Sequence, residues 1–250
     1  SEIKEAFMGK VAERLDINSA LLIPLVLNNK QVTGVLACMD DRFKKFSQEE
    51  IKICEEIASR IIKAISRIEK NISERESYLE IIKSMIDIFE SKNIATRDHS
   101  KNVSRLAGRI SSALEIPKEE EQEIRNSAYL HDIGKLGLTE DIIIDKEHIK
   151  SHPVIGARIV SMVQELKKLA PAIRHHHENW NGTGYPDGLQ GESIPLYSRI
   201  ISVANNYEVF LKEYSIPSLS IDKMKESGMF DPDICDVLKN KIFNDSNQKA

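Results

Sequence analysis

Residues 173–189 read IRHHHENWNGTGYPDGL, and they place three adjacent histidines directly before a turn-forming stretch. The chain has only seven histidines, and this stretch also holds its single tryptophan and three glycines. Neighbouring residues diverge by about 100° on a helix, so His175, His176 and His177 cannot all face one point. Two adjacent imidazoles can still converge on a metal ion from a helix end, which leaves one of the three as a bystander.

The other histidines stand next to carboxylates or at helical spacing. His131 is followed at once by Asp132 in YLHDIGKLGL, and His148 and His152 are four residues apart. Imidazole and carboxylate ligands together suit Mn, Fe or Zn, and one carboxylate can bridge two ions. A lone histidine such as His99 is more often a surface or capping residue, and we interpret His148 as solvated. The predicted metal site therefore depends on the whole set of histidines and on their order.

Residues 20–40, ALLIPLVLNNKQVTGVLACMD, predict a β-hairpin that turns at Asn28, Asn29 and Lys30. Aliphatic and β-branched residues flank a turn-forming pair there. Two strands do not form an independent core, so we expect a piece of a larger sheet or a sheet that pairs with another chain.

A long helix is predicted to follow, with Ser47 as its N-cap and Glu50 at the capping-box position. Its apolar residues recur at steps of three and four, and only Arg75 interrupts them. The stripe consists of Ile51, Cys54, Ala58, Ile61, Ile65, Ile68, Ile72, Leu79, Ile82, Ile86 and Phe89. More than five heptads without glycine or proline favour a parallel coiled-coil homodimer through residues 51–89. The alternative is a long helix that packs on its own domain.

The composition limits the function classes. The chain has 250 residues, 41% of them hydrophobic, and a net charge of −4 that gives no electrostatic footprint for a nucleic-acid polymer. The three cysteines, Cys38, Cys54 and Cys235, form no C-x-x-C pair, so we expect neither a disulfide framework nor a cysteine zinc site. We expect the protein to work in a reducing cytoplasm. The longest apolar run, ALLIPLVL, is too short to cross a bilayer, so no membrane segment is expected.

From about residue 91 onward the apolar spacing is helical, and two motifs there carry a family resemblance. His131 to Lys135 match the HD-x-G-K element, and His176 to Pro186 match the HHE…DG-x-GYP element, of the HD-GYP family of metal-dependent phosphodiesterases. The first 75 residues resemble the C-terminal half of a GAF domain. We therefore expect a mainly α fold, in which an α+β GAF-like fragment (1–75) runs through a helical linker (76–90) into an all-α HD-type domain (91–245).

The resemblance to the HD-GYP family implies a bacterial signalling enzyme that hydrolyses cyclic di-GMP with two divalent ions, Fe or Mn, with Zn as a further candidate. A hydroxide that bridges the ions attacks phosphorus, Asp132 bridges the same ions, and Lys135 neutralises the phosphoryl oxygens. The implied metal ligands are His99, His131, Asp132, His152, His176, His177 and Asn205. The residues implied to contact the substrate are Lys135, Trp180, Gly184, Tyr185 and Pro186.

The chain departs from the family pattern at four places. Asn205 stands where the family has an aspartate ligand, although Glu208 lies one turn further and could in principle substitute for it. Ala95 replaces the glutamate of members with three metals, and the segment between His131 and His152 lacks the usual KPG-x-L-T. The arginines that meet phosphate are absent, and residues 212–215 stand there instead. An alternative function is therefore a catalytically weakened signalling module that binds metal or nucleotide and acts through its dimer.

Overall fold

The computed structural model of the chain describes residues 17–27, 32–91, 98–138 and 147–244. The predicted turn at residues 28–30, the departure at Ala95 and most of the segment without KPG-x-L-T lie outside these residues. The chain divides into two compact units, Ser1–Glu74 and Arg75–Ala250. Helix α2 (Gln48–Ser91) contributes residues to both units.

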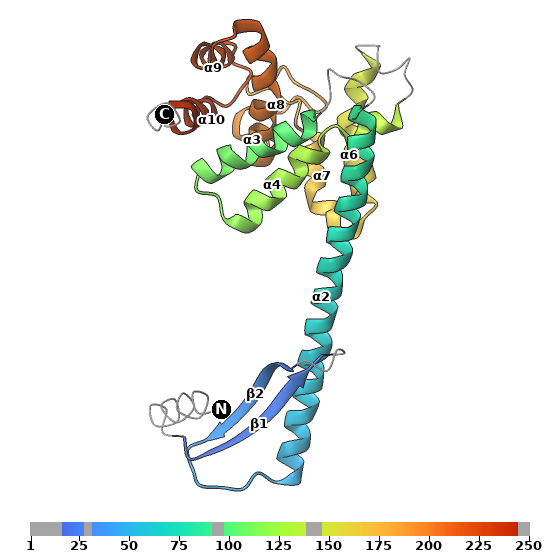
Figure 1. Cartoon of the computed structure of the whole chain (residues 1–250), viewed down its shortest axis with the longest axis vertical. Coiled ribbons are helices and arrows are strands. Elements are labelled where there is room, and N and C mark those ends of the chain that lie inside the picture. Colours follow the sequence, from blue (N-terminus) through green and yellow to red (C-terminus); the bar gives the residue numbers. More distant parts are fainter. Residues whose placement is uncertain (1–16, 28–31, 92–97, 139–146, 245–250) are drawn as a thin grey trace. The chain divides into compact units, whose positions relative to one another are not determined.

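The first unit contains the two predicted strands, which are confirmed. Strand β1 (Ser19–Val26) pairs antiparallel with β2 (Val32–Asp40) (Figure 1). Leu22 lies opposite Ala37 in this pairing. Exposed and half-buried residues alternate along β1, as the two-residue period of a strand requires. The arrangement of a strand pair followed by a helix is consistent with a fragment of a GAF domain.

The predicted capping box opens α2 and is confirmed. The backbone N–H of Glu50 donates to the Ser47 hydroxyl at 3.2 Å, and the backbone N–H of Ser47 donates to the Glu50 carboxylate at 2.7 Å. These bonds satisfy two backbone donors that the first turn of the helix leaves without partners. The helix then continues for 44 residues.

Two cysteines that are far apart in the sequence meet in this unit. The Sγ atoms of Cys38 on β2 and Cys54 on α2 lie 3.0 Å apart, and both thiols are free. The hydrogen bond with Cys38 raises the pKa of the Cys54 thiol. Cys235, in contrast, is fully buried in the other unit, and this burial raises its pKa to about 12.

Helices are the only regular secondary structure in the described part of the second unit, which confirms a mainly α fold. Its elements are α3 (His99–Ala113), α4 (Lys118–Leu130), η1 (Ile133–Gly137), η2 (His148–Ser151), α6 (His152–Ser161), η3 (Gln164–Leu169), α7 (Ala170–Arg174), η4 (Gly191–Ser193), α8 (Leu196–Tyr214), α9 (Pro217–Glu226), α10 (Pro232–Val237) and η5 (Leu238–Asn244). None of the described helices combines the length and the apolar character that a membrane crossing requires.

Two hydrophobic clusters form the core of the second unit, and α4 and α7 contribute to both. Ala128 and Ala172 belong to the first cluster, with α3, α8, α9 and α10. Leu130 and Ile173 belong to the second cluster, with α6, η3 and the end of α2. Burial of a Leu or Ile side chain contributes about 1.5–3 kcal/mol. The C-terminal ends of α4 and α7 are therefore held from two sides.

The apolar stripe of α2 has two different environments. Leu79 and Ile86 are buried in the second hydrophobic cluster, so residues 76–90 pack as part of the second unit. Ile68 and Ile72 are 58% and 53% exposed. Packing on its own domain thus accounts for the C-terminal part of the stripe, and a coiled-coil partner remains a prediction for the part before it.

Candidate metal centre

The predicted histidine ligands all lie at the ends of helices. His99 is the first residue of α3, and His152 is the first residue of α6. His131 directly follows α4, while His176 and His177 follow α7. A side chain at a helix end is fixed by the packing of that helix, so the two hydrophobic clusters hold these rings in place.

A buried carboxylate holds the N-terminus of α3. Asp98 precedes this helix with a φ of 60° and makes no capping hydrogen bond with its side chain. Glu90, at the end of α2 and only 5% exposed, accepts a hydrogen bond of 3.0 Å from the backbone N–H of Ser100. It thereby supplies the cap and fixes the neighbouring His99.

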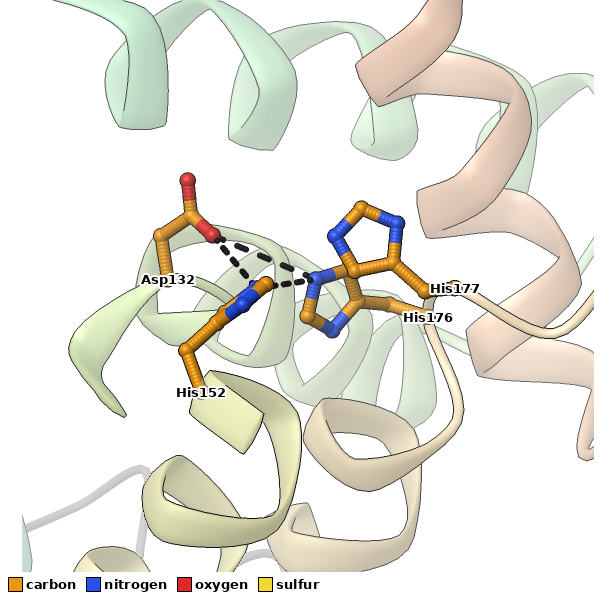
Figure 2. Close-up of side chains that lie close together, drawn as sticks. All are labelled: Asp132, His152, His176 and His177. Carbon is orange, nitrogen blue, oxygen red and sulfur yellow. Dashed lines mark hydrogen bonds and ion pairs between the residues drawn. The ribbon is translucent and has the colours of Figure 1, made fainter. Parts of the chain in front are cut away.

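The side chains gather into two groups that share Asp132. Ligand atoms within 4.8 Å of one another define the first ligand group, Asp132, His152, His176 and His177, and the second ligand group, His99, His131 and Asp132. Figure 2 shows the side chains of the first group converging. Nε2 of His152 lies 3.0 Å from Oδ1 of Asp132. The other oxygen, Oδ2, lies 3.4 Å from Nε2 of His131. Each carboxylate oxygen of Asp132 thus faces a different group.

Three of the histidine rings are oriented in the same way. Nδ1 of each lies 2.6–2.8 Å from the backbone oxygen three residues earlier, in the pairs His131–Ala128, His152–Ile149 and His176–Ile173. A carbonyl oxygen only accepts hydrogen bonds, so Nδ1 carries the proton of the neutral ring. The lone pair then lies on Nε2, which is the usual arrangement for a metal-binding histidine.

These lone pairs meet without a proton between them. Nε2 of His152 and Nε2 of His176 lie 3.3 Å apart, and neither neutral ring has a proton to donate to the other. Within the described residues, Nε2 of His131 and Oδ1 of Asp132 are buried without a hydrogen-bond partner. Buried acceptors in this state cost free energy unless a cation satisfies them. The donor set therefore fits divalent metal ions.

The electrostatics of the first ligand group favour the protonation states that ligands need. Burial lowers the pKa of His177 to about 3 and that of His176 well below its ordinary value. Burial alone would raise the pKa of Asp132, but its interactions with His131, Lys135 and His152 outweigh this effect and hold that pKa well below its ordinary value. Neutral rings and an ionised carboxylate are the forms that bind cations.

Lys135 lies beside this carboxylate and lines a cavity. Its ammonium donates to Oδ2 of Asp132 at 2.5 Å. The cavity, of about 220 Å³, is bounded by Lys135, Asp132, His99 and Glu90 together with an apolar wall from α2. A positive group and two members of the second ligand group, His99 and Asp132, thus face the same space.

Close backbone packing brings Asp132 and His152 together. A Cβ atom on Gly134 would lie 1.9 Å from the carbonyl oxygen of His152 and 2.6 Å from the backbone nitrogen of Gly156. Only a residue without a side chain allows η1 and α6 to touch in this way. Gly134 therefore sets the distance between the two elements that carry these ligands.

His175 takes no part in either ligand group. Its Nδ1 lies 2.9 Å from the carbonyl oxygen of Pro171, and its Nε2 lies 2.9 Å from Oδ2 of Asp187. Asp187 is also bound by the Arg174 guanidinium at 2.6 and 2.8 Å. Both ring nitrogens of His175 are thus engaged by oxygens outside the ligand groups.

The loop after the histidines is folded around Glu178, whose structural role the motif did not reveal. This carboxylate is 2% exposed and accepts hydrogen bonds from the backbone N–H groups of Asp187 at 2.7 Å and Leu189 at 3.1 Å. Gly182 has a φ of 80°, which favours glycine. Gly184 is required for a different reason, because a Cβ atom there would lie 2.2 Å from the backbone nitrogen of Asn179. Space, rather than φ, requires that glycine.

The aromatic residues of the loop contact protein side chains. The ring of Tyr185 stacks on His177 with centroids 4.8 Å apart, and burial raises the tyrosine pKa to about 12. The Arg199 guanidinium lies over the Trp180 ring at 5.6 Å. The peptide bond between Tyr185 and Pro186 is cis. One face of Tyr185 thus supports a candidate ligand, and contact of these residues with a substrate remains a prediction.

Helix α8 carries the side chains that bear on the departure at residue 205. Asn205 is half-buried, and its side chain makes no hydrogen bond with the described part of the chain. One turn later, Oε2 of Glu208 lies 3.4 Å from Nδ1 of His99. Burial opposes protonation of His99, but Glu208 and Asp132 together raise its pKa.

His148 is exposed on η2 and belongs to neither ligand group.

Comparison with known proteins identifies the second unit. A family model described as "HD domain" matches residues 83–234. A cyclic di-GMP phosphodiesterase of Thermotoga maritima is 32% identical over 154 residues, which cover 57% of this chain and 42% of that protein. A 3'3'-cGAMP-specific phosphodiesterase of Vibrio cholerae is 32% identical over 148 residues, covering 55% and 32%. The chain therefore spans less than half the length of these relatives.

Solved structures share the fold. A cyclic GMP-AMP-specific phosphodiesterase of Vibrio cholerae has a TM-score of 0.51 and 21% identity, over 61% of this chain and 45% of that one. An HDG"Y"P protein of Bdellovibrio bacteriovorus has a TM-score of 0.50 and 17% identity, over 90% and 99% of the two chains.

Proposed function

The chain belongs to the HD domain family, and we propose that it is a metal-dependent phosphodiesterase of the HD-GYP type that hydrolyses cyclic di-GMP. The observation that carries this proposal is the position of Asp132, whose two oxygens face two different groups of histidines. A shared carboxylate of this kind suits two adjacent divalent ions. The names of the relatives, which act on cyclic di-GMP or cyclic GMP-AMP, support a cyclic dinucleotide as substrate.

We propose that His152, His176 and His177 hold one ion, that His99 and His131 hold the other, and that Asp132 bridges them. Fe or Mn is the proposed metal, with Zn as a further candidate. When bound, such ions lower the pKa of water and polarise a phosphoryl oxygen. Hydrolysis adds one water molecule across one phosphodiester bond: the water oxygen bonds to phosphorus, one P–O bond breaks, and the leaving ribose oxygen takes up a proton as a hydroxyl.

The residues of the chain position these reactants. The carbonyl oxygens of Ala128, Ile149 and Ile173 keep Nε2 of three histidines directed at the centre. Lys135 lines the adjacent cavity, where its ammonium can neutralise charge that develops on the phosphoryl oxygens. Stacking against Tyr185 limits the rotation of His177. We also propose that Trp180, Gly184 and Pro186 shape the substrate side of the loop.

A second candidate function is a catalytically weakened signalling module that binds metal or nucleotide. The neutral amide of Asn205, in place of a carboxylate ligand, favours it. The complete first ligand group and Lys135 favour the enzyme, so we place hydrolysis first.

Metal-dependent turnover of cyclic di-GMP tests the proposal. The protein, loaded with Mn²⁺ or Fe²⁺, is incubated with cyclic di-GMP, and the linear dinucleotide and GMP are separated by chromatography. We expect product that disappears with a chelator and returns with added metal, and 3'3'-cGAMP measures the specificity in parallel. A protein that holds its ions but hydrolyses neither dinucleotide would instead be the signalling module.

We further propose that the first unit is the C-terminal part of a GAF-like domain and that the chain forms a parallel homodimer through α2. The strand pair followed by a capped helix supports the first proposal. The exposure of Ile68 and Ile72 supports the second. In a coiled coil these side chains are buried against the same residues of the partner helix.

Replacing Ile68 and Ile72 together with glutamate should dissociate this dimer. Each isoleucine contributes about 1.5–3 kcal/mol when buried, and each 1.4 kcal/mol changes a dissociation constant about tenfold. We therefore expect the dissociation constant of the dimer to rise at least about 100-fold, as measured by light scattering over a concentration series. Lys70→Glu is the control, because the Lys70 side chain is 75% exposed. This substitution changes the net charge by a similar amount but on another face of the helix. A parent chain that is monomeric at micromolar concentration would contradict the coiled coil.

A further inference from the structure

We propose that Glu208 is a positioning residue of the second ligand group, where its carboxylate orients His99 and supplies the negative charge that Asn205 lacks. This inference rests on the proposed metal centre and concerns only the position formed by His99, His131 and Asp132. The observation that carries it is the contact between Nδ1 of His99 and Oε2 of Glu208, at 3.4 Å. The two residues are 109 positions apart in the chain.

His99 requires a partner that the other histidines find within their own segments. His131, His152 and His176 each donate Nδ1–H to the carbonyl oxygen three residues earlier. His99 is the first residue of α3, so no earlier turn of its own helix offers a carbonyl oxygen. The carboxylate from α8 occupies the corresponding place beside Nδ1.

This contact leaves the other ring nitrogen of His99 for a cation. When Nδ1–H donates to Glu208, the neutral ring carries its lone pair on Nε2. The second ligand group contains His99 together with His131 and Asp132, whereas Glu208 is not a member of it. In the proposed arrangement the carboxylate lies behind the ring and acts through it, as in carboxylate–histidine–metal arrangements.

The metal position formed by His99, His131 and Asp132 also needs negative charge. Its two histidines are neutral when they bind a cation, and Asp132 is shared with the first ligand group. Asn205, on the same face of α8 as Glu208, offers only an amide dipole. The side chains of His99 and Glu208 are 22% and 31% exposed, so solvent screens this pair less than it screens a surface pair. A carboxylate there attracts a divalent ion that the amide of Asn205 binds weakly.

Metal binding by Glu208→Gln tests the inference without reference to activity. Glutamine keeps the size of the side chain and removes its charge. Parent and variant are dialysed against a buffer of defined Mn²⁺ activity, and the bound metal is counted by mass spectrometry. We expect about two ions per parent chain and about one per variant chain, with the affinity of the weaker position reduced about 10- to 100-fold. Glu213→Gln, at an exposed position of the same helix, should bind as the parent does.

A double-mutant cycle with Asn205→Asp separates this role from a general disturbance of α8. A carboxylate at residue 205 restores charge at the same position, so Glu208→Gln should reduce affinity less in the Asn205→Asp background than in the parent. Glu208→Asp, which keeps the charge, should retain more of the second ion than Glu208→Gln. Equal losses in both backgrounds would overturn the compensating role of Glu208.

The outcomes also separate this inference from the proposed function. A parent that retains two ions while Glu208→Gln retains both with unchanged affinity overturns the role of Glu208 and leaves the metal centre intact. A parent that binds no divalent ion at all overturns the metal centre, and the inference with it. With chelator present, the Tm should be the same for the parent and for Glu208→Gln. If Glu208→Gln does not fold, the test is made with Glu208→Asp and Asn205→Asp.

Discussion

Asp132→Ala is expected to remove both metal ions and to lower the turnover of cyclic di-GMP at least about 1,000-fold. Asp132 is the one residue common to both ligand groups, so its loss takes a charged ligand from each. A thousandfold decrease corresponds to about 4 kcal/mol of transition-state stabilisation, which is the size that bound metal ions supply. Metal content and the rate of product formation measure the two effects on the same preparation.

The matched control for this variant is Asp222→Ala. Asp222 pairs with Lys239 at 2.6 Å and belongs to neither ligand group, so this variant should keep its metal and its rate. Ions that bind only the folded chain stabilise it, so added Mn²⁺ should raise the Tm of the parent and of Asp222→Ala but not that of Asp132→Ala. An Asp132→Ala chain that still binds two ions per molecule would exclude the bridging role.

His176→Ala and His175→Ala are expected to differ sharply although the residues are adjacent. His176 is fully buried, with Nε2 3.3 Å from Nε2 of His152 and 4.0 Å from Oδ1 of Asp132. Its removal should weaken the ion of the first ligand group by about two orders of magnitude or more and abolish most turnover. His175 is bound to Pro171 and Asp187, so its removal should leave the metal content nearly unchanged.

The pair of variants contains its own control, because both remove an imidazole from the same short segment. Metal content after dialysis, measured for both variants and for His177→Ala, gives the comparison. His177→Ala should follow His176→Ala, since both rings belong to the first ligand group. Equal metal loss from all three variants would mean that the segment responds as a whole and that His175 is no bystander.

The sequence alone predicted the features that depend on neighbouring residues. The capping box of Ser47 and Glu50 joins backbone and side-chain atoms three residues apart, and the apolar spacing of α3 repeats every three to four residues. Strand β1 was predicted from a run of aliphatic and β-branched residues before a turn-forming pair. Such interactions are encoded locally, so a pattern of residue types is enough to predict them.

The predicted ligands came from the order of two motifs, but the sequence did not indicate how they are held. Helix ends bring His131 and His176 together, and carbonyl oxygens three residues earlier set the tautomer of each ring. Gly184 is required by space at the backbone of Asn179, and a motif cannot distinguish this from a positive φ. The division of the α2 stripe was likewise undecided, because Leu79 and Ile68 are equivalent in a heptad and differ only in what packs against them.

Tertiary packing alone decided the contacts between distant residues. Cys38 and Cys54 appear unrelated in sequence, yet their Sγ atoms lie 3.0 Å apart. Glu208 was only one possible substitute for a missing carboxylate until the packing of α8 against α3 brought it within 3.4 Å of His99. The physical reason is the same in both cases. A local pattern specifies the conformation of a segment, whereas the distance between two segments depends on how all of their buried side chains fill the core together.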